Sequence, residues 1–435
     1  MWRAGLLGLL PLACATVTSY STLSTFSPGA FIIKRQIGQL GFATETEWAY
    51  KRDGELVTPN PLDPSQPKRT IDQSGISVRL FDARLDDGRR VLLKEFIGDA
   101  TELAENECAV YELVNQRAIS LAQGSDRAAA PPQQLSRLLG LMRADSTFAT
   151  ESFRNDWEYA LPNVPPPSAD GVWLCFEWEN LVQTVSSFPR AAQERSLFDM
   201  GGKQARQERA RFVRAVCYRC IELVAWLHGQ GIAHRSLGGA SLLLNTHDQR
   251  VAPTQVALKA VDLGFAATAA RISAEEVAAA MQRGASSPLS VIPFLCKADD
   301  LHALAYVLLE LCLETALPAP TQPGGGLPTG GLFGGGGGDS ALSDEAAREK
   351  APPTDVQSLK RLVEDVFGGD VCGEFRAYCL EEPAWQGAVE LLDDADRSGW
   401  KLIQSLVECR DASSERCEGV SAAKCLESAW FDVPP

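Results

Sequence analysis

The chain has 435 residues and a formal net charge of −15, and 45% of its residues are hydrophobic. This length holds one large two-lobed domain with extensions or two ordinary domains, and the apolar content is enough for a core. The acidic charge argues against nucleic acid or an anionic membrane surface as the main partner. We therefore expect a soluble acidic protein whose partners are other proteins.

The first 30 residues have the composition of a targeting peptide. Arg3 gives a basic start, Ala4–Leu12 is apolar but too short to span a bilayer, and Ala13-Cys14-Ala15 supplies the small residues of a secretory cleavage site. Serine and threonine are abundant in residues 16–27, and the first acidic residue is Glu45. The stretch resembles the bipartite leaders of algal plastids, with a chloroplast transit peptide or plain secretion as alternatives. No other segment reaches transmembrane length.

The stretch after this leader is expected to lie outside the folded domain. Residues 31–70 form an irregular extension, in which Phe31–Lys34 and Glu47–Arg52 are candidate strands and Ile37–Phe42 is a turn. The segment Ser77–Leu85 then alternates in polarity, Asp86–Gly88 is a hairpin turn, and Arg89–Phe96 returns as a second strand. We expect the folded domain to begin at residue 71 with this hairpin.

The next elements are a helix and two strands. Apolar residues in Leu103–Val114 recur at helical spacing. Leu138–Met142 is a further short strand, and residues 145–170 are a loop insertion that contains several prolines. Gly171–Glu179 is an apolar, aromatic run that we interpret as a buried strand.

The centre of the chain is its most informative stretch. Apolar residues between 213 and 229 recur at helical spacing, which predicts a buried amphipathic helix. A polar loop at His234–Ser241 comes next, and then a strand at Leu242–Leu244 and a second strand at Val256–Val261. The second strand leads Asp262 into a tight turn.

The last third of the chain combines helices with irregular segments. Phe265–Ala298 is expected to be a flexible segment, and Asp300–Leu313 a buried helix. Residues 318–355 contain the glycine-rich run Pro323–Gly338, which cannot offset its ordering entropy by burial and is expected to be a disordered insertion. Helical patterns resume over Val356–Phe431.

The central layout resembles the protein kinase family, whose pattern is helix, His-Arg-Asp-Leu…Asn, two strands and Asp-Phe-Gly. Here the residues are His234-Arg235-Ser236-Leu237, then Ser241, and later Asp262-Leu263-Gly264. The resemblance covers about residues 71 to 431. It implies an α+β fold with two lobes, a β-rich N-lobe over 71–178 and a helical C-lobe over 179–431.

The resemblance also implies a nucleotide site for ATP with Mg²⁺. Lys94 matches the strand lysine that pairs with the phosphates, and Glu107 matches the helix glutamate that pairs with this lysine. Asp262 matches the metal-binding aspartate, and Phe176 and Trp178 lie where the adenine would bind to the backbone. Two alternatives stay open: the Lys94–Glu107 pair is purely structural, and the two aromatic rings fill the cleft.

The sequence departs from the family at the residues that carry its chemistry. Ser236 stands where the family has the aspartate that accepts the substrate proton, and Ser241 where it has the asparagine that holds a second metal ion. The resemblance leaves structural roles to His234, Arg235 and Asp300. No catalytic residue is therefore intact in this loop.

A second departure concerns the glycine loop that covers the phosphates in the family. Ile71–Val78 is expected to take its place, with Asp72, Ser74 and Ser77 at the three glycine positions. Side chains there would hinder the close approach of backbone amides to phosphate. We therefore expect only weak nucleotide binding.

The 12 cysteines do not form a recognisable zinc motif. Cys217 and Cys220 lie on the predicted central helix, where buried thiols acting as small apolar groups are the preferred interpretation. One disulfide within the late group is the alternative reading for Cys372, Cys379, Cys409, Cys417 and Cys425.

These observations favour a pseudokinase, a kinase-like domain with weak ATP binding that acts as a scaffold or regulator of protein partners. The first alternative is an unorthodox but active Ser/Thr kinase or another ATP-dependent transferase, because phosphoryl transfer depends mostly on positioning and electrostatics. The second alternative is a structural subunit of a plastid complex with a filled cleft.

Overall fold

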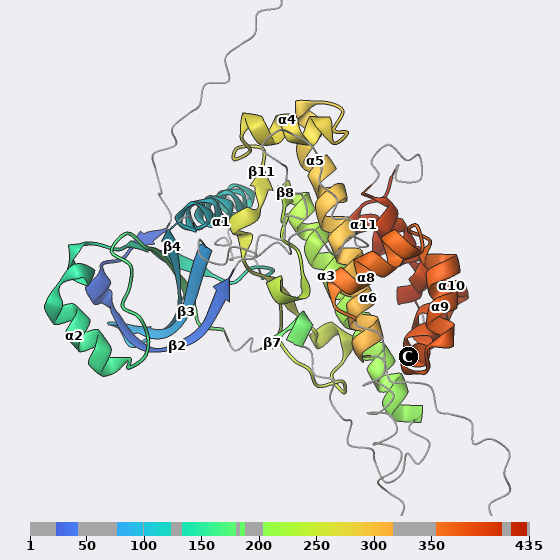
Figure 1. Ribbon diagram of the computed structural model, residues 1–435, viewed down its shortest axis with the longest axis horizontal. Coiled ribbons are helices and arrows are strands. Elements are labelled where there is room, and N and C mark those ends of the chain that lie inside the picture. Colours follow the sequence, from blue (N-terminus) through green and yellow to red (C-terminus); the bar gives the residue numbers. More distant parts are fainter. Residues whose placement is uncertain are drawn as a thin grey trace, which may run out of the picture.

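The computed structural model describes residues 23–41, 76–98, 100–122, 133–179, 183–187, 203–315, 354–410 and 419–432. Within these ranges the chain forms a β-rich N-terminal lobe and a larger helical C-terminal lobe (Figure 1). The expected α+β class with two lobes is confirmed. The glycine-rich run Pro323–Gly338 lies outside the described residues.

The N-terminal lobe is built on one six-stranded sheet with the order β1-β5-β6-β4-β3-β2. Its strands are β1 (Ser24–Thr25), β2 (Phe31–Gly41), β3 (Ile76–Leu85), β4 (Arg90–Gly98), β5 (Leu138–Arg143) and β6 (Val172–Glu177). The predicted hairpin is confirmed as β3 and β4, which are joined by a turn in which Gly88 takes a φ of +85°. This left-handed conformation favours glycine because it has no Cβ.

Strand β2 corrects the start of the N-lobe. It runs antiparallel to β3, from the pair Phe31–Leu85 to the pair Gly41–Ser77. The prediction of a turn at Ile37–Phe42 is wrong for Ile37 to Gly41, which are strand residues. The error has a physical reason: β2 is an edge strand with two register shifts, and its partner comes only after residues 42–75. Periodicity alone does not show such a distant pairing.

Strand β1 corrects the end of the predicted targeting peptide. Ser24 and Thr25 pair in parallel with Gly140 and Leu141 of β5, and Leu23 is 7% exposed within the core. Residues 23–30 are therefore part of the fold, and residues 1–22 lie outside the described residues.

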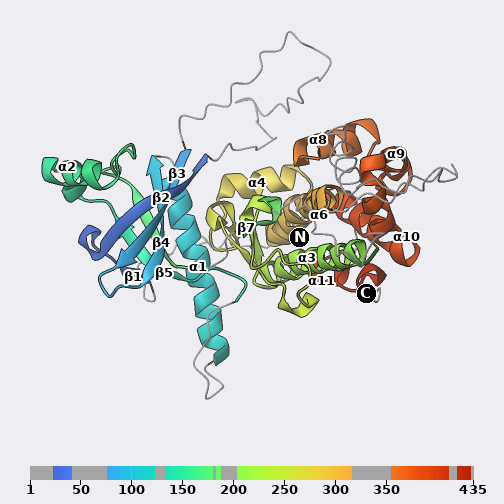
Figure 2. The same cartoon turned by 90° about the horizontal axis from the view of Figure 1, so that it is seen from below.

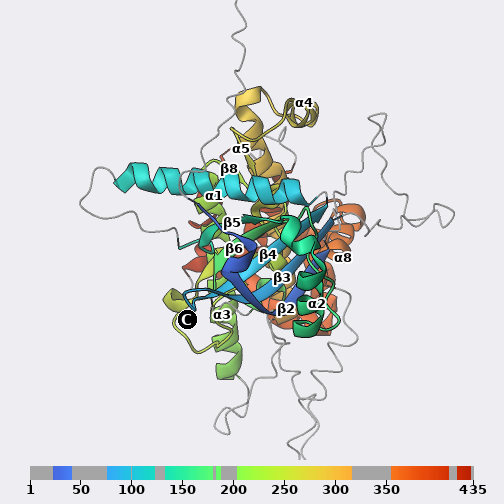
Figure 3. The same cartoon turned by 90° about the vertical axis from the view of Figure 1, so that its left-hand side faces the viewer.

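The two faces of the sheet are covered by different helices (Figures 2 and 3). Helix α1 (Thr101–Ala122) packs on the face that carries Val78 and Phe96. Helix α2 (Glu151–Ala160) covers the opposite face, where Trp157 packs among side chains that include Phe81 and Trp173. The prediction of a loop over 145–170 is therefore wrong in its middle. Only Phe153 and Trp157 of α2 face inward, too few apolar residues to give a helical period.

A buried ion pair fixes the loop after α2 to the sheet. Arg79 donates to the carboxylate of Glu95 at 2.5 Å, and both side chains are almost fully buried. The guanidinium of Arg79 also donates to the carbonyl of Pro165 at 2.6 Å, and Glu95 accepts from the amide of Ser168 at 3.1 Å. These additional hydrogen bonds offset the desolvation of the two charges.

The C-terminal lobe is mostly helical and contains two small sheets. Its strands are β7 (Gln183–Thr184), β8 (Ile232–Ala233), β9 (Leu242–Leu244), β10 (Leu258–Ala260) and β11 (Ala267–Thr268). Its helices are α3 (Lys203–Gly229), α4 (Ala274–Gln282), α5 (Val291–Leu295), α6 (His302–Thr315), α8 (Val356–Lys360), α9 (Arg376–Glu381), α10 (Gln386–Glu408) and α11 (Ala422–Cys425). Asp394–Arg397 interrupt α10 with non-helical backbone.

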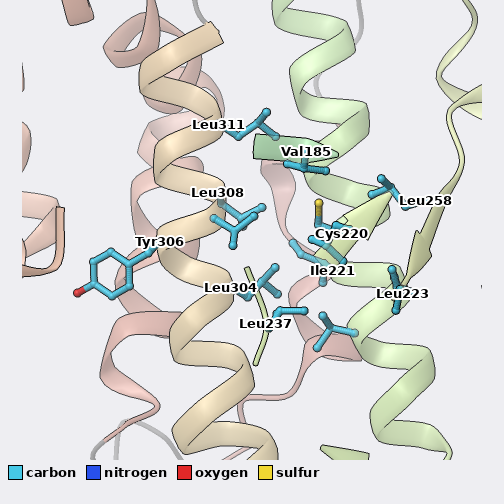
Figure 4. Close-up of a cluster of buried hydrophobic side chains, with 14 of the residues drawn as sticks. Val185, Cys220, Ile221, Leu223, Leu237, Leu258, Leu304, Tyr306, Leu308 and Leu311 are labelled. Carbon is cyan, nitrogen blue, oxygen red and sulfur yellow. The ribbon is translucent and has the colours of Figure 1, made fainter. Parts of the chain in front are cut away.

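The core of this lobe lies between α3 and α6. Figure 4 shows Cys220 and Ile221 of α3 on the side toward Leu304 and Leu308 of α6, and all four side chains are buried. The predicted central helix and the predicted buried helix after Asp300 are confirmed. The cysteines of α3 are free thiols, and burial raises the pKa of Cys220 to about 12. Of the late group, Cys372, Cys379 and Cys425 are free thiols as well.

The segment after Asp262 is more ordered than its sequence suggests. It contains β11, which pairs with β8, and the helices α4 and α5. A capping box between Ser273 and Glu276 starts α4. The prediction of a flexible segment over Phe265–Ala298 is wrong. Within the described ranges, no helix is both long enough and apolar enough to cross a membrane.

The contact between β1 and β5 allows a test of whether β1 belongs to the folded N-lobe. A Cβ at Gly140 would collide with the carbonyl oxygen of Ser24, whereas a Cβ at Gly29 would meet no atom within 4 Å. We expect Gly140→Ala to lower the free energy of unfolding by about 1–3 kcal/mol and to expose the amide of Phe26, which donates to Leu141. Urea unfolding and hydrogen exchange measure both effects. Gly29→Ala is the matched control, and equal stability of the two variants would contradict the role of β1.

Candidate functional site

Three charged side chains from three different elements meet between the lobes. The Lys94 ammonium on β4 donates to the Glu107 carboxylate on α1 at 2.8 Å and to the Asp262 carboxylate at 2.6 Å. The side chains of Lys94 and Glu107 are 5% and 2% exposed, and that of Asp262 is 16% exposed. One cation is thus shared by two carboxylates, and the Asp262 carboxylate is the part of this cluster that solvent reaches most.

The buried position and the opposite charges shift the pKa values of this cluster. Burial disfavours the ammonium charge, but the carboxylates of Asp262 and Glu107 outweigh burial and raise the pKa of Lys94 above its ordinary value. For Glu107 burial is the largest influence and raises the pKa of the carboxyl, while Lys94 acts in the opposite direction. Lys94 is therefore charged at neutral pH.

Backbone contacts hold α1 against the turn that carries Asp262. Asn106 donates from its side chain to the carbonyls of Gly264 and Ala266, each at 2.8 Å. A Cβ at Gly264 would lie 2.9 Å from the Cβ of Leu103, so the helix approaches the turn too closely for a larger residue. Asp262 itself has a left-handed backbone with a φ of 63°. Asn106 is not predicted from the sequence, because a single polar residue on a helix carries no pattern.

The loop before Asp262 is anchored by a buried carboxylate. Asp300 is fully buried and accepts from the backbone amides of His234 and Arg235, each at 2.7 Å, and it contacts His228 Nε2 at 3.0 Å. Arg235 has a left-handed backbone with a φ of 62°, which these hydrogen bonds hold in place. Nε2 of His234 lies 3.1 Å from the carbonyl oxygen of Val261 and thereby connects the loop to Asp262.

The two serines of this loop lie in different environments. Ser236 is exposed, and its amide lies 3.4 Å from Nδ1 of His234. Ser241 is buried, and its hydroxyl donates to the carbonyl of Gly238 at 2.9 Å and accepts from the amide of Gly238 at 3.0 Å. The hydroxyl of Ser241 thus closes its own loop, and no side chain from Ser236 to Ser241 carries a charge.

The acidic residues near Ser236 are engaged elsewhere. Glu276 of α4 accepts from Arg235 at 2.7 Å, and Asp299 accepts from Arg283 at 2.8 Å. Asp300 binds the backbone of the loop. Among the described residues, no hydrogen bond or ion pair brings a carboxylate to Ser236 as a substitute for the missing aspartate.

The two aromatic residues at the edge of the site contact side chains of α1 and β4. Phe176 is 4% exposed and meets Tyr111 of α1 edge to face at 5.7 Å. The ring of Trp178 lies under the guanidinium of Arg90 at 3.6 Å. Beyond Trp178, Glu179 forms an ion pair with Lys259 of β10 at 2.5 Å. This pair joins the segment that leaves the N-lobe to the sheet of the C-lobe.

The predicted replacement for the glycine loop needs a correction. Ser77 is a strand residue of β3 that pairs with Gly41, so it cannot occupy a loop position. Asp72 and Ser74 lie outside the described residues. Because β2 ends at Gly41 and β3 begins at Ile76, the connection between the first two long strands is residues 42–75.

The shared cation gives a prediction about stability and its dependence on pH. Lys94→Met leaves Glu107 and Asp262 without their cation, and we expect a loss of about 3–5 kcal/mol in the free energy of unfolding near neutral pH. Because Lys94 no longer opposes the effect of burial, the pKa of Glu107 in the folded variant rises further above its unfolded value. The variant is therefore most stable relative to wild type at acid pH, and it loses stability as the pH rises through the folded pKa.

Urea unfolding between about pH 4 and pH 8 measures this dependence. The matched control is the double variant Lys94→Met with Glu107→Gln, which removes the titrating group and should flatten the curve. A pH dependence that is the same in the single and double variants would contradict the assignment to Glu107.

Comparisons with known proteins add two likenesses in structure. No protein-family model and no curated protein matches the chain. The chain is similar to the crystal structure of an Stt7 homolog from Micromonas algae soaked with ATP, with a TM-score of 0.46 and 17% identity over 82% of this chain and 89% of that chain. It is also similar to titin kinase and its flanking domains, with a TM-score of 0.42 and 12% identity over 95% of this chain and 50% of that chain.

The order of the elements matches the pattern expected from the sequence. A lobe built on an antiparallel sheet carries Lys94 and one long helix carrying Glu107, and a helical lobe carries the His234 loop and the turn at Asp262. Asp300, which lies just before the buried helix α6, binds the backbone of this loop and joins the loop to the helix. The described residues therefore have the two-lobed α+β arrangement that the resemblance to the protein kinase family implies.

Proposed function

We propose that this protein is a pseudokinase: it binds a nucleotide weakly, transfers little or no phosphate, and acts as a scaffold or regulator of protein partners. The observation that carries this proposal is the loop from Ser236 to Ser241. Its frame is held by Asp300, but it offers no carboxylate, amide side chain or cation to a reacting phosphate.

The loss of the general base lowers the reaction rate enough to separate a fast reaction from a negligible one. A positioned base contributes roughly 10²–10⁴ in rate, or about 3–5 kcal/mol of barrier. A serine hydroxyl cannot accept a proton near neutral pH, so Ser236 cannot supply this contribution. The acids Glu276, Asp299 and Asp300 are bound to Arg235, Arg283 and the loop backbone, respectively.

The residues of the site fit a nucleotide with one magnesium ion, but they do not fit a second metal ion. Lys94 has the position and charge to pair with the first phosphates of a nucleotide, and the partly exposed Asp262 carboxylate is suited to hold Mg²⁺. The magnesium ion would neutralise phosphate charge. Ser241 does not fit a second metal ion, because its hydroxyl is already engaged with both backbone groups of Gly238.

An unorthodox enzyme remains the second candidate, and the intact Lys94–Glu107–Asp262 cluster favours it. Phosphoryl transfer depends mostly on positioning and electrostatics, so the loss of a base lowers the rate without abolishing the reaction. The third candidate, a structural subunit with a filled cleft, receives less support. The two rings proposed to fill the cleft, Phe176 and Trp178, pack against Tyr111 and Arg90 instead.

We also propose that the residues before Leu23 direct the chain to a plastid, with the secretory pathway as the alternative. The proposal is supported by the basic start, the apolar run and the absence of acidic residues before Glu45. The involvement of Leu23 and Ser24 in the fold limits where a processing enzyme can cut. Mass spectrometry of the mature N-terminus tests this, and a start after Phe31 would contradict it.

Thermal melting tests the nucleotide-binding part of the proposal. We expect millimolar ATP with Mg²⁺ to raise the melting temperature of the wild-type protein by about 1–3 °C, since a weak ligand stabilises in proportion to its occupancy. Asp262→Ala should abolish the shift because it removes the carboxylate that receives the metal ion.

The matched control for this experiment is Asp156→Ala, which removes an exposed carboxylate on α2 far from the site. This control should keep the full shift. If the wild-type melting temperature stays unchanged by ATP with Mg²⁺, or if both variants lose the shift equally, nucleotide binding at this site is rejected.

A further inference from the structure

We propose that Asn106 is a positioning residue for magnesium-dependent nucleotide binding: its side chain holds the turn after β10 so that the Asp262 carboxylate is presented to the metal ion. The inference rests on the proposed function, in that a nucleotide with Mg²⁺ binds between Lys94 and Asp262. It goes further by assigning control of the metal-dependent affinity to an uncharged residue of α1 that acts through the backbone of the turn.

The side-chain amide of Asn106 uses both of its donors on this turn. Its Nδ2 atom donates to the carbonyl oxygen of Gly264 and to that of Ala266, each at 2.8 Å. A side-chain amide carries two N–H groups, so both bind main-chain acceptors that follow Asp262 closely. The reverse orientation of the amide would place its oxygen against two carbonyl oxygens, which have no proton to donate. This position therefore requires a donor.

The next residue of α1 holds the same turn by its amide. Besides binding the lysine, the Glu107 carboxylate accepts a hydrogen bond from the backbone amide of Leu263. Within the turn, the amide of Ala266 donates to the carbonyl of Leu263 at 3.0 Å. Asn106 and Glu107 thus bind carbonyl and amide groups of one short segment, and α1 fixes the course of its backbone.

The backbone of Asp262 depends on such support. Its φ of 63° is left-handed, a conformation that is strained for a residue with a side chain and persists where the surroundings hold it. Its carboxylate binds the Lys94 ammonium at 2.6 Å and is partly exposed. A small change of the backbone at this residue would turn the carboxylate, so the contacts that hold the turn also set the direction of the carboxylate.

Close packing brings the turn and α1 together before any hydrogen bond is counted. A Cβ at Gly264 would lie 2.9 Å from the Cβ of Leu103 and 3.2 Å from its carbonyl oxygen. Leu263 is fully buried. Asn106 lies three residues after Leu103 and therefore on the same face of the helix. Packing keeps the turn close to this face, and the hydrogen bonds of Asn106 fix its orientation.

The metal ion is more sensitive than the phosphates to the direction of the Asp262 carboxylate. Mg²⁺ requires near-ideal octahedral geometry, whereas the Lys94 ammonium is a point charge on a flexible stem and adapts to a phosphate. A small rotation of the turn therefore weakens the binding of nucleotide with Mg²⁺ and leaves the binding of metal-free nucleotide nearly unchanged. This selectivity distinguishes a positioning role from a general loss of stability.

Asn106→Leu isolates the two hydrogen bonds, because leucine has nearly the shape of asparagine but no donor. The matched control is Asn245→Leu in the turn between β9 and β10. Asn245 donates to the carbonyl of Gln255 at 2.9 Å and accepts from the amide of Ala257 at 2.8 Å. Both variants lose two hydrogen bonds to the backbone, but those of Asn245 lie outside the turn at Asp262.

Isothermal titration of the full chain with ATP, in Mg²⁺ and in EDTA, measures the affinity that the metal ion adds. We expect Asn106→Leu to weaken binding in Mg²⁺ by about tenfold, or about 1.4 kcal/mol, and binding in EDTA by less than about twofold. Asn245→Leu should keep both affinities. Thermal melting without nucleotide shows whether the variants are folded. Asn106→Ala, which removes the donors without adding apolar atoms, takes the place of a leucine variant that does not fold.

Hydrogen exchange without nucleotide gives a second readout of the same contact. The amide of Ala266 should exchange about fivefold faster in Asn106→Leu than in the wild-type protein, because the turn opens more often when its carbonyls lose their donors. In Asn245→Leu this amide should exchange at the wild-type rate.

The outcomes separate this inference from the function on which it rests. Equal losses of affinity in Mg²⁺ and in EDTA overturn the inference, because the role of Asn106 is then only structural. Unchanged exchange at Ala266, or unchanged affinity in Mg²⁺ in a folded variant, also overturns it. Wild-type binding of ATP that is independent of Mg²⁺ overturns the inference and leaves nucleotide binding intact. Failure of ATP to bind under either condition rejects the proposed function, and the inference with it.

Discussion

The structure depends on one buried cation that two carboxylates share. Lys94 belongs to the sheet, Glu107 to α1 and Asp262 to the turn after β10, so a single ammonium group joins both lobes and the helix between them. Its charge is costly to bury alone, and each carboxylate is costly to bury without it. This mutual dependence gives the cluster a structural role whether or not the protein transfers phosphate.

In the loop beside this cluster, the groups that fix the backbone are different from the side chains that would take part in a reaction. Asp300 holds the backbone of His234 and Arg235, and the backbone at Arg235 is left-handed, so the path of the loop is fixed by hydrogen bonds to main-chain amides. Of the side chains from Ser236 onward, Leu237 is buried in the core and Ser241 binds Gly238, whereas Ser236 is exposed and supports no part of this path. The path of the loop is therefore maintained whatever side chain stands at Ser236.

The sequence predicted the elements whose signal is local. The hairpin of β3 and β4 has its own turn, α3 has a clear apolar period, and the residues Lys94, Glu107 and Asp262 lie on elements in a fixed order. It predicted only the first residues of β2, Phe31–Lys34, as a candidate strand, because the partner of β2 comes after residues 42–75. It did not predict β1, which has only two residues. It also missed α2 and α4, because α2 has few inward-facing side chains and α4 is rich in alanine. The contact between Leu103 and Gly264 depends on tertiary packing, which no pattern along the chain indicates.

The central claim is that this cleft keeps its nucleotide-binding groups and has lost phosphate transfer. A single-turnover experiment tests it most directly, with the protein in excess over radiolabelled ATP and with Mg²⁺ present, so that bound nucleotide is followed without product release. The account predicts that the label is recovered as ATP at the rate of the protein-free control. Formation of ADP or of a labelled protein above that rate, abolished by Asp262→Ala, would contradict it.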